Sequence, residues 1–183
     1  TITLAENTKG QITAIDLFPK MITLLKERAI RHGLSDRISG IAVSMENLPF
    51  EPGELDLIWA EGSIYNIGFE RGLREWKQFL KPGGMIAVSE VSWLTNTRPD
   101  EIEQFWNFNY AEIDTISNKI KKFRQNICNN RHASQHVIRN SVCSSGSQRN
   151  GNWGMNKLRK GSGYLTVFYT NGTEFDNMVT VMY

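Results

Sequence analysis

The sequence has little of several features that would place it in a specialised class of protein. Only two of its 183 residues are cysteines, Cys128 and Cys143, so it is not a disulfide-stapled scaffold, and we expect two reduced thiols. No apolar run approaches the roughly 18 residues that span a bilayer. The first residues also lack the basic flank and apolar stretch of a signal peptide. The composition predicts a cytoplasmic globular protein with no membrane partner.

Metal-binding and hydrolase motifs are also scarce. His132 and His136 are four residues apart, and Cys128 lies four residues before His132. This spacing would place the three side chains on one helical face. The segment nevertheless has no convincing fourth ligand and no firm helix signal, so we predict no metal site. The Ser, His and Asp residues form no recognisable hydrolase motif.

Charge is divided unevenly along the chain, although the net charge is only +2. Residues 121–183 contain nine Lys and Arg against two acids, a charge of +7, whereas residues 1–120 contain twelve against seventeen, a charge of −5. Residues 126–156 are rich in Asn, Ser, Gly and Arg and offer few apolar anchors. Because the basic residues are scattered and no specific nucleic-acid motif accompanies them, a solvated or disordered tail is favoured over a nucleic-acid site.

Strand-like and helix-like patterns alternate through the first two thirds of the chain. Apolar, β-branched segments predict strands at residues 11–16, 38–43, 55–60 and 85–88. Apolar residues at helical spacing predict helices at residues 19–32, 70–80, 98–106 and 113–123. This alternation indicates an α/β fold with a mostly parallel sheet covered on both faces. We therefore predict an α/β domain at residues 1–125 and an atypical tail at 126–183, in which segments 164–170 and 178–183 would pair as a hairpin.

Four segments occur in the order and approximate spacing found in class I S-adenosylmethionine-dependent methyltransferases. They are Thr13-Ala-Ile-Asp16, Asn47-Leu-Pro-Phe50, Glu54-Leu-Asp-Leu-Ile-Trp59 and Leu80-Lys-Pro-Gly-Gly84. Residues 59–68 further resemble a bacterial group of small-molecule or uncharacterised methyltransferases. The resemblance covers residues 1–125. It implies a three-layer Rossmann-like fold, S-adenosylmethionine as the cofactor, and methyl transfer to a small-molecule acceptor.

The resemblance also assigns cofactor-binding roles to residues at the strand ends. Asp16, with Leu17 beside it, would grip the ribose, although the acid could instead cap the following helix. Ser44 stands where the family more often has Asp near the adenine, and Met45 would lie against the purine; the alternative is a turn serine and a core methionine. Glu61 would receive the cofactor's ammonium or face the substrate, or else pair with a surface base such as Arg71.

A substrate pocket is predicted beside the ends of the third and fourth strands. Tyr65, Glu90 and Trp93 are its candidates, and the aromatic residues that follow are those of a substrate lid or of a core. No catalytic residue is assigned, because methyl transfer depends on positioning and needs a base only when the acceptor carries a proton.

Two parts of the family pattern are missing. No segment before Thr13 supplies the central first strand or its glycine-rich turn, so the domain is predicted to be truncated, and the tail does not resemble the family's final antiparallel hairpin. We hypothesise an altered reading frame or a foreign join near residues 123–130. The alternatives are therefore a non-catalytic fragment or binding module and, because an acid also ends the second strand of dinucleotide-binding folds, a nicotinamide-dependent oxidoreductase.

Overall fold

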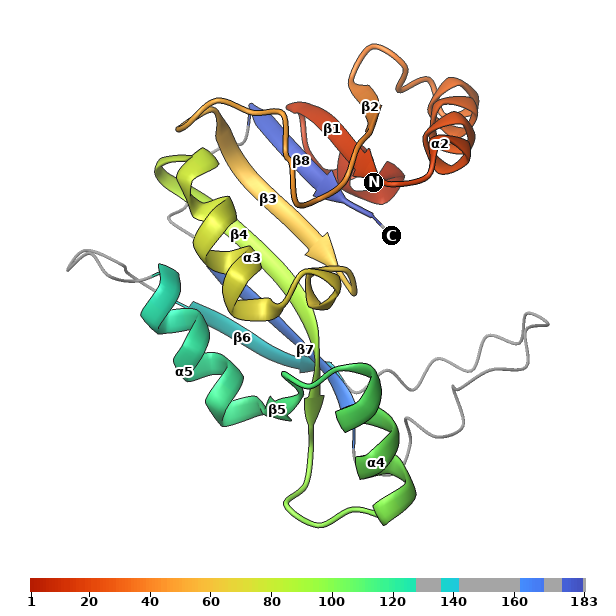
Figure 1. The fold of residues 1–183 in the computed structure, drawn as a ribbon. Helices are drawn as coiled ribbons and strands as arrows, with labels where there is room; N and C mark the ends of the chain where they lie inside the picture. Colours follow the sequence, from red (N-terminus) through yellow and green to blue (C-terminus); the bar gives the residue numbers. More distant parts are fainter. Residues whose placement is uncertain (128–135, 142–161, 170–175, 183) are drawn as a thin grey trace.

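The computed structural model describes residues 1–127, 136–141, 162–169 and 176–182, and their strands form one sheet (Figure 1). The strand order is β2-β1-β8-β3-β4-β7-β6, and β5 pairs with the end of β4. The strands are β1 Gln11–Asp16, β2 Ile38–Ala42, β3 Leu55–Glu61, β4 Leu80–Trp93, β5 Asp114–Thr115, β6 His136–Ser141, β7 Ser162–Tyr169 and β8 Asn177–Val181. The helices are α1 Ile2–Asn7, α2 Pro19–Arg31, α3 Phe69–Trp76, α4 Asp100–Asn109 and α5 Ile116–Ile127, with 3₁₀ turns at Ile64–Asn66 and Lys77–Phe79.

The sheet has a helical layer on each face, so the predicted three-layer α/β class is confirmed. Successive residues of β1 face opposite sides of the sheet: Ile12 packs with α1 and α2, whereas Ile15 packs in the cluster that contains α3 and α5. Strands β2, β1, β8, β3 and β4 run parallel to their neighbours, and β7 and β6 are antiparallel. Within the part of the chain that the structure describes, no helix is long and apolar enough to cross a membrane.

Helix α2 shows how local sequence sets an element. Pro19 occupies its first turn, where a missing N–H is tolerated, and Gly33 follows its end with a φ of 65°. Ile22 and Leu25 are buried as their spacing predicts, whereas Ile30 is 68% exposed because it lies beyond the apolar stripe.

Strand β8 lies in the middle of the parallel sheet. It pairs with β1 through Met178 beside Ile12, and with β3 through Val179 beside Ile58. The predicted hairpin between segments 164–170 and 178–183 is therefore wrong: β7 pairs with β4 and β6 instead. The hairpin prediction failed because strand-like patterning does not identify the partner, and the apolar slot between β1 and β3 buries β8 on both faces.

The slot occupied by β8 is the place that the family resemblance gives to the missing first strand. The sheet consequently has no gap between β1 and β3. Strands β6 and β7 also form an antiparallel pair beyond β4. The tail therefore forms an antiparallel pair although its sequence does not resemble the family's final hairpin, because backbone pairing does not require the family's side chains.

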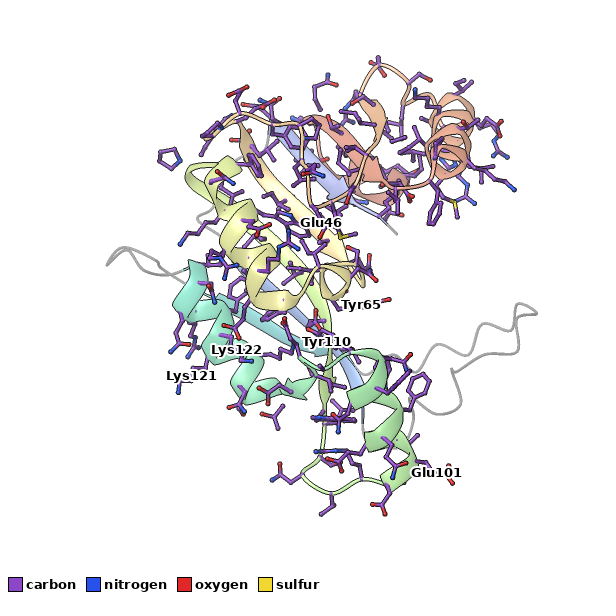
Figure 2. All side chains as sticks on the ribbon, in the orientation of Figure 1. Glu46, Tyr65, Glu101, Tyr110, Lys121 and Lys122 are labelled. Atoms are coloured by element: carbon purple, nitrogen blue, oxygen red, sulfur yellow. The ribbon has the colours of Figure 1, made fainter. Side chains whose placement is uncertain are left out.

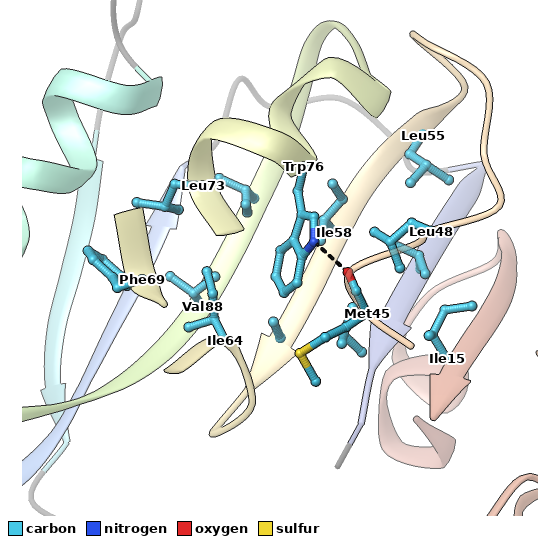
Figure 3. Packing of buried hydrophobic residues seen from close by; sticks show 14 of the residues in the cluster. Ile15, Met45, Leu48, Leu55, Ile58, Ile64, Phe69, Leu73, Trp76 and Val88 are labelled. Atoms are coloured by element: carbon cyan, nitrogen blue, oxygen red, sulfur yellow. Dashed lines mark hydrogen bonds between the residues drawn. The ribbon is translucent and has the colours of Figure 1, made fainter. Parts of the chain in front are cut away.

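The main apolar core lies between the sheet and the helices α3 and α5 (Figure 3). Trp76 is its largest side chain, and its indole Nε1 donates a hydrogen bond of 3.1 Å to the Met45 carbonyl. This bond ties α3 to the loop after β2. The helix predicted at residues 70–80 ends earlier, at Trp76, and segment 81–84 (Lys-Pro-Gly-Gly), which lies before the predicted strand at 85–88, is part of β4. Gly83 adopts a φ of 83° beside a shift in the β3–β4 register.

Candidate functional site

The carboxyl edge of the parallel sheet brings the predicted site residues to one side of the molecule. Asp16 is the last residue of β1, Glu61 the last residue of β3, and Trp93 the last residue of β4. Ligands of open α/β sheets bind at this edge, because the loops diverge where the strand order reverses. The edge is therefore the candidate site.

Asp16 is a buried carboxylate with a defined orientation. It is 2% exposed, and its Oδ1 accepts a hydrogen bond of 2.8 Å from the Phe18 N–H. Phe18 is the N-cap residue of α2, so the Asp16 carboxylate, two residues before it, bonds the N-cap amide and not an N–H of the first turn. Leu17 and Phe18 are half exposed beside the carboxylate. The ribose role of Asp16 and the contact of Leu17 with the cofactor remain predictions.

Ser44 and Met45 have the local roles that the alternative interpretation gave them. The Ser44 Oγ accepts a hydrogen bond of 3.2 Å from the Glu46 N–H, so it orders the turn after β2. Met45 is 7% exposed and packs in the main core. These contacts do not test whether either residue also meets an adenine ring, which stays a prediction.

Glu61 is exposed at the end of β3, and its neighbour Gly62 is fixed by a hydrogen bond from its N–H to the Ser89 Oγ at 2.7 Å. The suggested pairing of Glu61 with Arg71 is wrong. Arg71 pairs with Glu46 at 2.7 Å and with Glu75 at 2.9 Å, one helical turn further along α3. Binding of a cofactor ammonium by Glu61 remains a prediction.

The three predicted pocket residues lie around the end of β4. The ring of Tyr65, in the turn after β3, is 5.8 Å from the ring of Tyr110 (Figure 2). Trp93 is largely buried, and the Arg98 guanidinium lies 4.0 Å from the centre of its ring. Glu90 is fully buried. Only Tyr65 is partly exposed, so Glu90 and Trp93 lie behind the surface of this region.

Sequence reasoning missed the partner of Glu90, which is Lys119 of α5. Its Nζ lies 3.5 Å from the Glu90 Oε1 and donates a hydrogen bond of 2.7 Å to the Tyr110 hydroxyl. The same Nζ is 4.6 Å from the ring centres of Phe69 and Tyr110. Lys119 lies four residues before the buried Phe123 on the apolar stripe of α5, and this position was the signal that could have identified it.

Burial sets the electrostatics of this cluster. It raises the pKa of Glu90 from 4.5 to about 7, although the Lys119 ammonium opposes the rise. Burial lowers the pKa of Lys119, against the attraction of Glu90, and raises the pKa of the Tyr110 hydroxyl. The Tyr110 hydroxyl also lowers the pKa of Glu90, although among the described residues neither Glu90 oxygen has a hydrogen bond of good geometry. No group of three His, Cys, Asp or Glu suited to a metal ion occurs among the residues that the structure places.

The strand order and the helices on both faces define an open α/β domain of the doubly wound type. Residues 1–88 match the family model described as a methyltransferase domain. This match covers 88 of the 183 residues and supports the sequence resemblance to class I S-adenosylmethionine-dependent methyltransferases. The match decides against the nicotinamide-dependent oxidoreductase.

The curated relatives that this chain matches are named as methyltransferases. The ubiquinone/menaquinone biosynthesis C-methyltransferase UbiE of Brucella anthropi is 30% identical over 105 residues, which cover 57% of this chain and 40% of the relative. UbiE of Bartonella henselae is 29% identical over 135 residues, 73% of this chain and 48% of the relative. The chain thus spans less than half the length of these relatives.

Solved structures share the fold at low sequence identity. A geranyl diphosphate C-methyltransferase from Streptomyces coelicolor A3(2), solved with S-adenosyl-L-homocysteine, has a TM-score of 0.66 at 14% identity, covering 92% of this chain and 65% of its own. The [4+2]-cyclase SpnF has a TM-score of 0.62 at 19% identity, covering 93% of this chain and 70% of its own. Because one neighbour is named a cyclase and the other a methyltransferase, the shared fold alone does not assign a reaction.

Proposed function

We propose that the protein binds S-adenosylmethionine at the carboxyl edge of its sheet and transfers the methyl group to a small-molecule acceptor. The observation that carries the proposal is the match of residues 1–88 to the methyltransferase domain, together with the buried Asp16 at the end of β1. Small-molecule acceptors are favoured because the relatives are named as enzymes of ubiquinone and menaquinone biosynthesis. A cytoplasmic location remains a prediction.

The residues present fit the nucleoside half of the cofactor. The Asp16 carboxylate is held by the Phe18 amide, which leaves carboxylate oxygen capacity for a ribose diol, and the half-exposed Leu17 and Phe18 offer apolar surface of the kind that an adenine ring packs on. At the methionine half, Glu61 offers a carboxylate for an ammonium. Met182, which follows β8, donates its N–H to the Ile15 carbonyl at 2.8 Å.

The bound cofactor would supply an electrophilic methyl group on a sulfonium. The chain's own contribution would then be orientation and exclusion of water. Asp16 would fix the nucleoside, and Tyr65 would border the acceptor beside the end of β3. A non-catalytic binding module is the remaining alternative, because the same Asp16 edge could hold the nucleoside without an acceptor.

Calorimetry with S-adenosylhomocysteine tests the proposal, after circular dichroism has shown cooperative unfolding. We expect a micromolar Kd and a loss of about tenfold or more in affinity for Asp16→Asn, since a charge-assisted hydrogen bond contributes about 1.5 to 3 kcal/mol. Asp36→Asn, at an exposed turn residue, is the matched control and should bind as the wild type does. No heat from a folded wild-type chain would refute cofactor binding. Binding without methyl transfer to any offered acceptor would favour the binding module.

A further inference from the structure

The buried cluster at the end of β4 joins parts of the chain that are distant in sequence. Glu90 comes from β4, Lys119 from α5, and Tyr110 from the loop after α4. In the same loop, the Glu112 Oε2 accepts a hydrogen bond of 3.0 Å from the N–H of Phe69, the first residue of α3. The cluster therefore links residues 100–119, which we call the cap segment, to the sheet and to α3.

The cap segment lies over the end of β4, near the candidate site. Ile102 and Tyr110 pack in one apolar cluster with Val91 and Trp93 of β4, and the partly buried Tyr65 packs against this cluster. Figure 2 shows Tyr65 and Tyr110 close together where β3 and β4 end. Movement of the cap segment would therefore change how Tyr110 packs against Tyr65 near the carboxyl edge.

The charged pair in the cluster is poorly compensated. Both Glu90 and Lys119 are fully buried, but their charged atoms are 3.5 Å apart, and among the described residues neither Glu90 oxygen has a hydrogen bond of good geometry. Burial raises the pKa of Glu90, and the nearby Lys119 ammonium and Tyr110 hydroxyl offset this rise only in part. The hydroxyl of Ser92, on the same face of β4, is likewise buried without a hydrogen-bond partner in the described ranges of the chain. Such an ion pair contributes little free energy to the closed form of the cap segment, because the desolvation of the carboxylate offsets its attraction to the ammonium.

We propose that Glu90, Lys119 and Tyr110 form a proton-operated clasp, which holds the cap segment against the sheet and opens more readily as the pH rises through neutrality. The clasp would regulate access to the acceptor side of the edge, and only this consequence rests on the proposed methyl transfer. The pH-dependent opening and closing of the cap segment does not depend on methyl transfer.

The direction of the pH effect follows from which form, closed or open, binds the Glu90 proton more tightly. In the closed form its pKa is raised to about 7, whereas in an opened, hydrated form it would return towards 4.5. Between these values the closed form binds a proton that the open form lacks, so low pH favours closure and the advantage is lost as the pH rises through 7. Lys119, whose pKa is lowered by burial, acts with the opposite sign at more alkaline pH.

The other charged groups around the pair are held by contacts of their own or lie at the surface. Lys122 of α5 pairs with Glu70 at 3.0 Å and with Asp114 at 3.6 Å. Glu112 is bonded to the Phe69 amide, and Glu61 at the end of the adjacent β3 is exposed. Strand β7, which pairs with β4 here, contains no Asp, Glu, His, Lys or Arg in its sequence. Among the described groups packed against the cluster, Glu90 is therefore the one expected to titrate near neutral pH.

Hydrogen exchange of the full chain at pH 6 and pH 8 tests the clasp, with rates converted to protection factors. We expect the opening equilibrium of the cap segment to be about tenfold larger at pH 8, as two pKa values of 4.5 and about 7 require. Glu90→Gln, which is neutral at every pH, should abolish this difference and protect the cap segment at both pH values at least as strongly as in the wild type at pH 6. Glu101→Gln, an exposed change on α4, is the control and should behave as the wild type does.

A pH-dependent opening that persists in Glu90→Gln would overturn the clasp, as would equal protection of the wild type at the two pH values. If Glu90→Gln does not fold, Lys119→Met replaces it: removal of the ammonium should move the midpoint to higher pH, and an unchanged midpoint counts against the clasp. The calorimetry with S-adenosylhomocysteine is independent. Absence of heat with a pH-dependent cap segment would refute the proposed function and leave the clasp standing.

Discussion

The central position of β8 can be tested by removing two methyl groups from its core. Val179 is fully buried, packs in the main core and lies between Thr13 of β1 and Ile58 of β3. Val179→Ala removes about 1.6 kcal/mol of transfer free energy, at about 0.8 kcal/mol for each buried carbon. A residual cavity adds to this loss, because neighbouring side chains relax only in part, so the free energy of unfolding should fall by about 2 to 3 kcal/mol.

Urea denaturation followed by tryptophan fluorescence and circular dichroism measures this loss. With a slope of about 2 kcal/mol/M, the midpoint should fall by about 1 to 1.5 M and the slope should stay constant. Ile30→Ala is the control, since its side chain is 68% exposed on α2 and its truncation should change stability by less than about 0.5 kcal/mol. A change this small for Val179→Ala would refute the reasoning, because it would mean that residues 177–181 do not complete the sheet.

Three further substitutions test contacts that hold the domain together, each by urea denaturation. Trp76→Phe leaves the Met45 carbonyl without its indole donor and should reduce the free energy of unfolding by about 2 kcal/mol; an unchanged midpoint would contradict this. Arg37→Met removes hydrogen bonds of 2.8 to 2.9 Å to three carbonyls in and after α1, and should cost about 2 to 4 kcal/mol. Gly68→Ala should cost about 1 to 3 kcal/mol, since φ is 89° and the new Cβ would lie 2.7 Å from Glu112.

The first part of the fold could be predicted because its signals are local. The strand ending at Asp16 and the helix beginning at Pro19 follow from β-branched residues, proline geometry and apolar spacing within a few residues. The place of β8 could not be predicted, because strand pairing joins residues more than 150 positions apart and depends on which slot is vacant. The division of the chain at Gln125 and the altered reading frame remain predictions.

The sequence predicted which edge of the sheet carries the site, but not the contacts within the site. Strand ends locate Asp16 and Glu61, because parallel strands bring their carboxyl ends together. The sequence could not pair Glu90 with Lys119, which lie on a strand and a helix separated by 29 positions, and a lysine in a helix is ordinarily assigned to the surface. Only its place on the buried stripe of α5, one turn before Phe123, indicated otherwise.

The position of β8 separates two properties that a methyltransferase domain usually combines. A parallel ladder needs only backbone groups and apolar side chains, so Met178, Val179 and Val181 can complete the sheet whatever follows them. Cofactor affinity needs more, because the methionine half must meet backbone donors in a turn that side chains do not crowd. Stability and affinity should therefore respond to different residues: Val179→Ala should lower the free energy of unfolding with little change in the Kd for S-adenosylhomocysteine, and Asp16→Asn should do the reverse. If both variants weakened binding equally in a folded chain, β8 would belong to the cofactor site and this separation would be wrong.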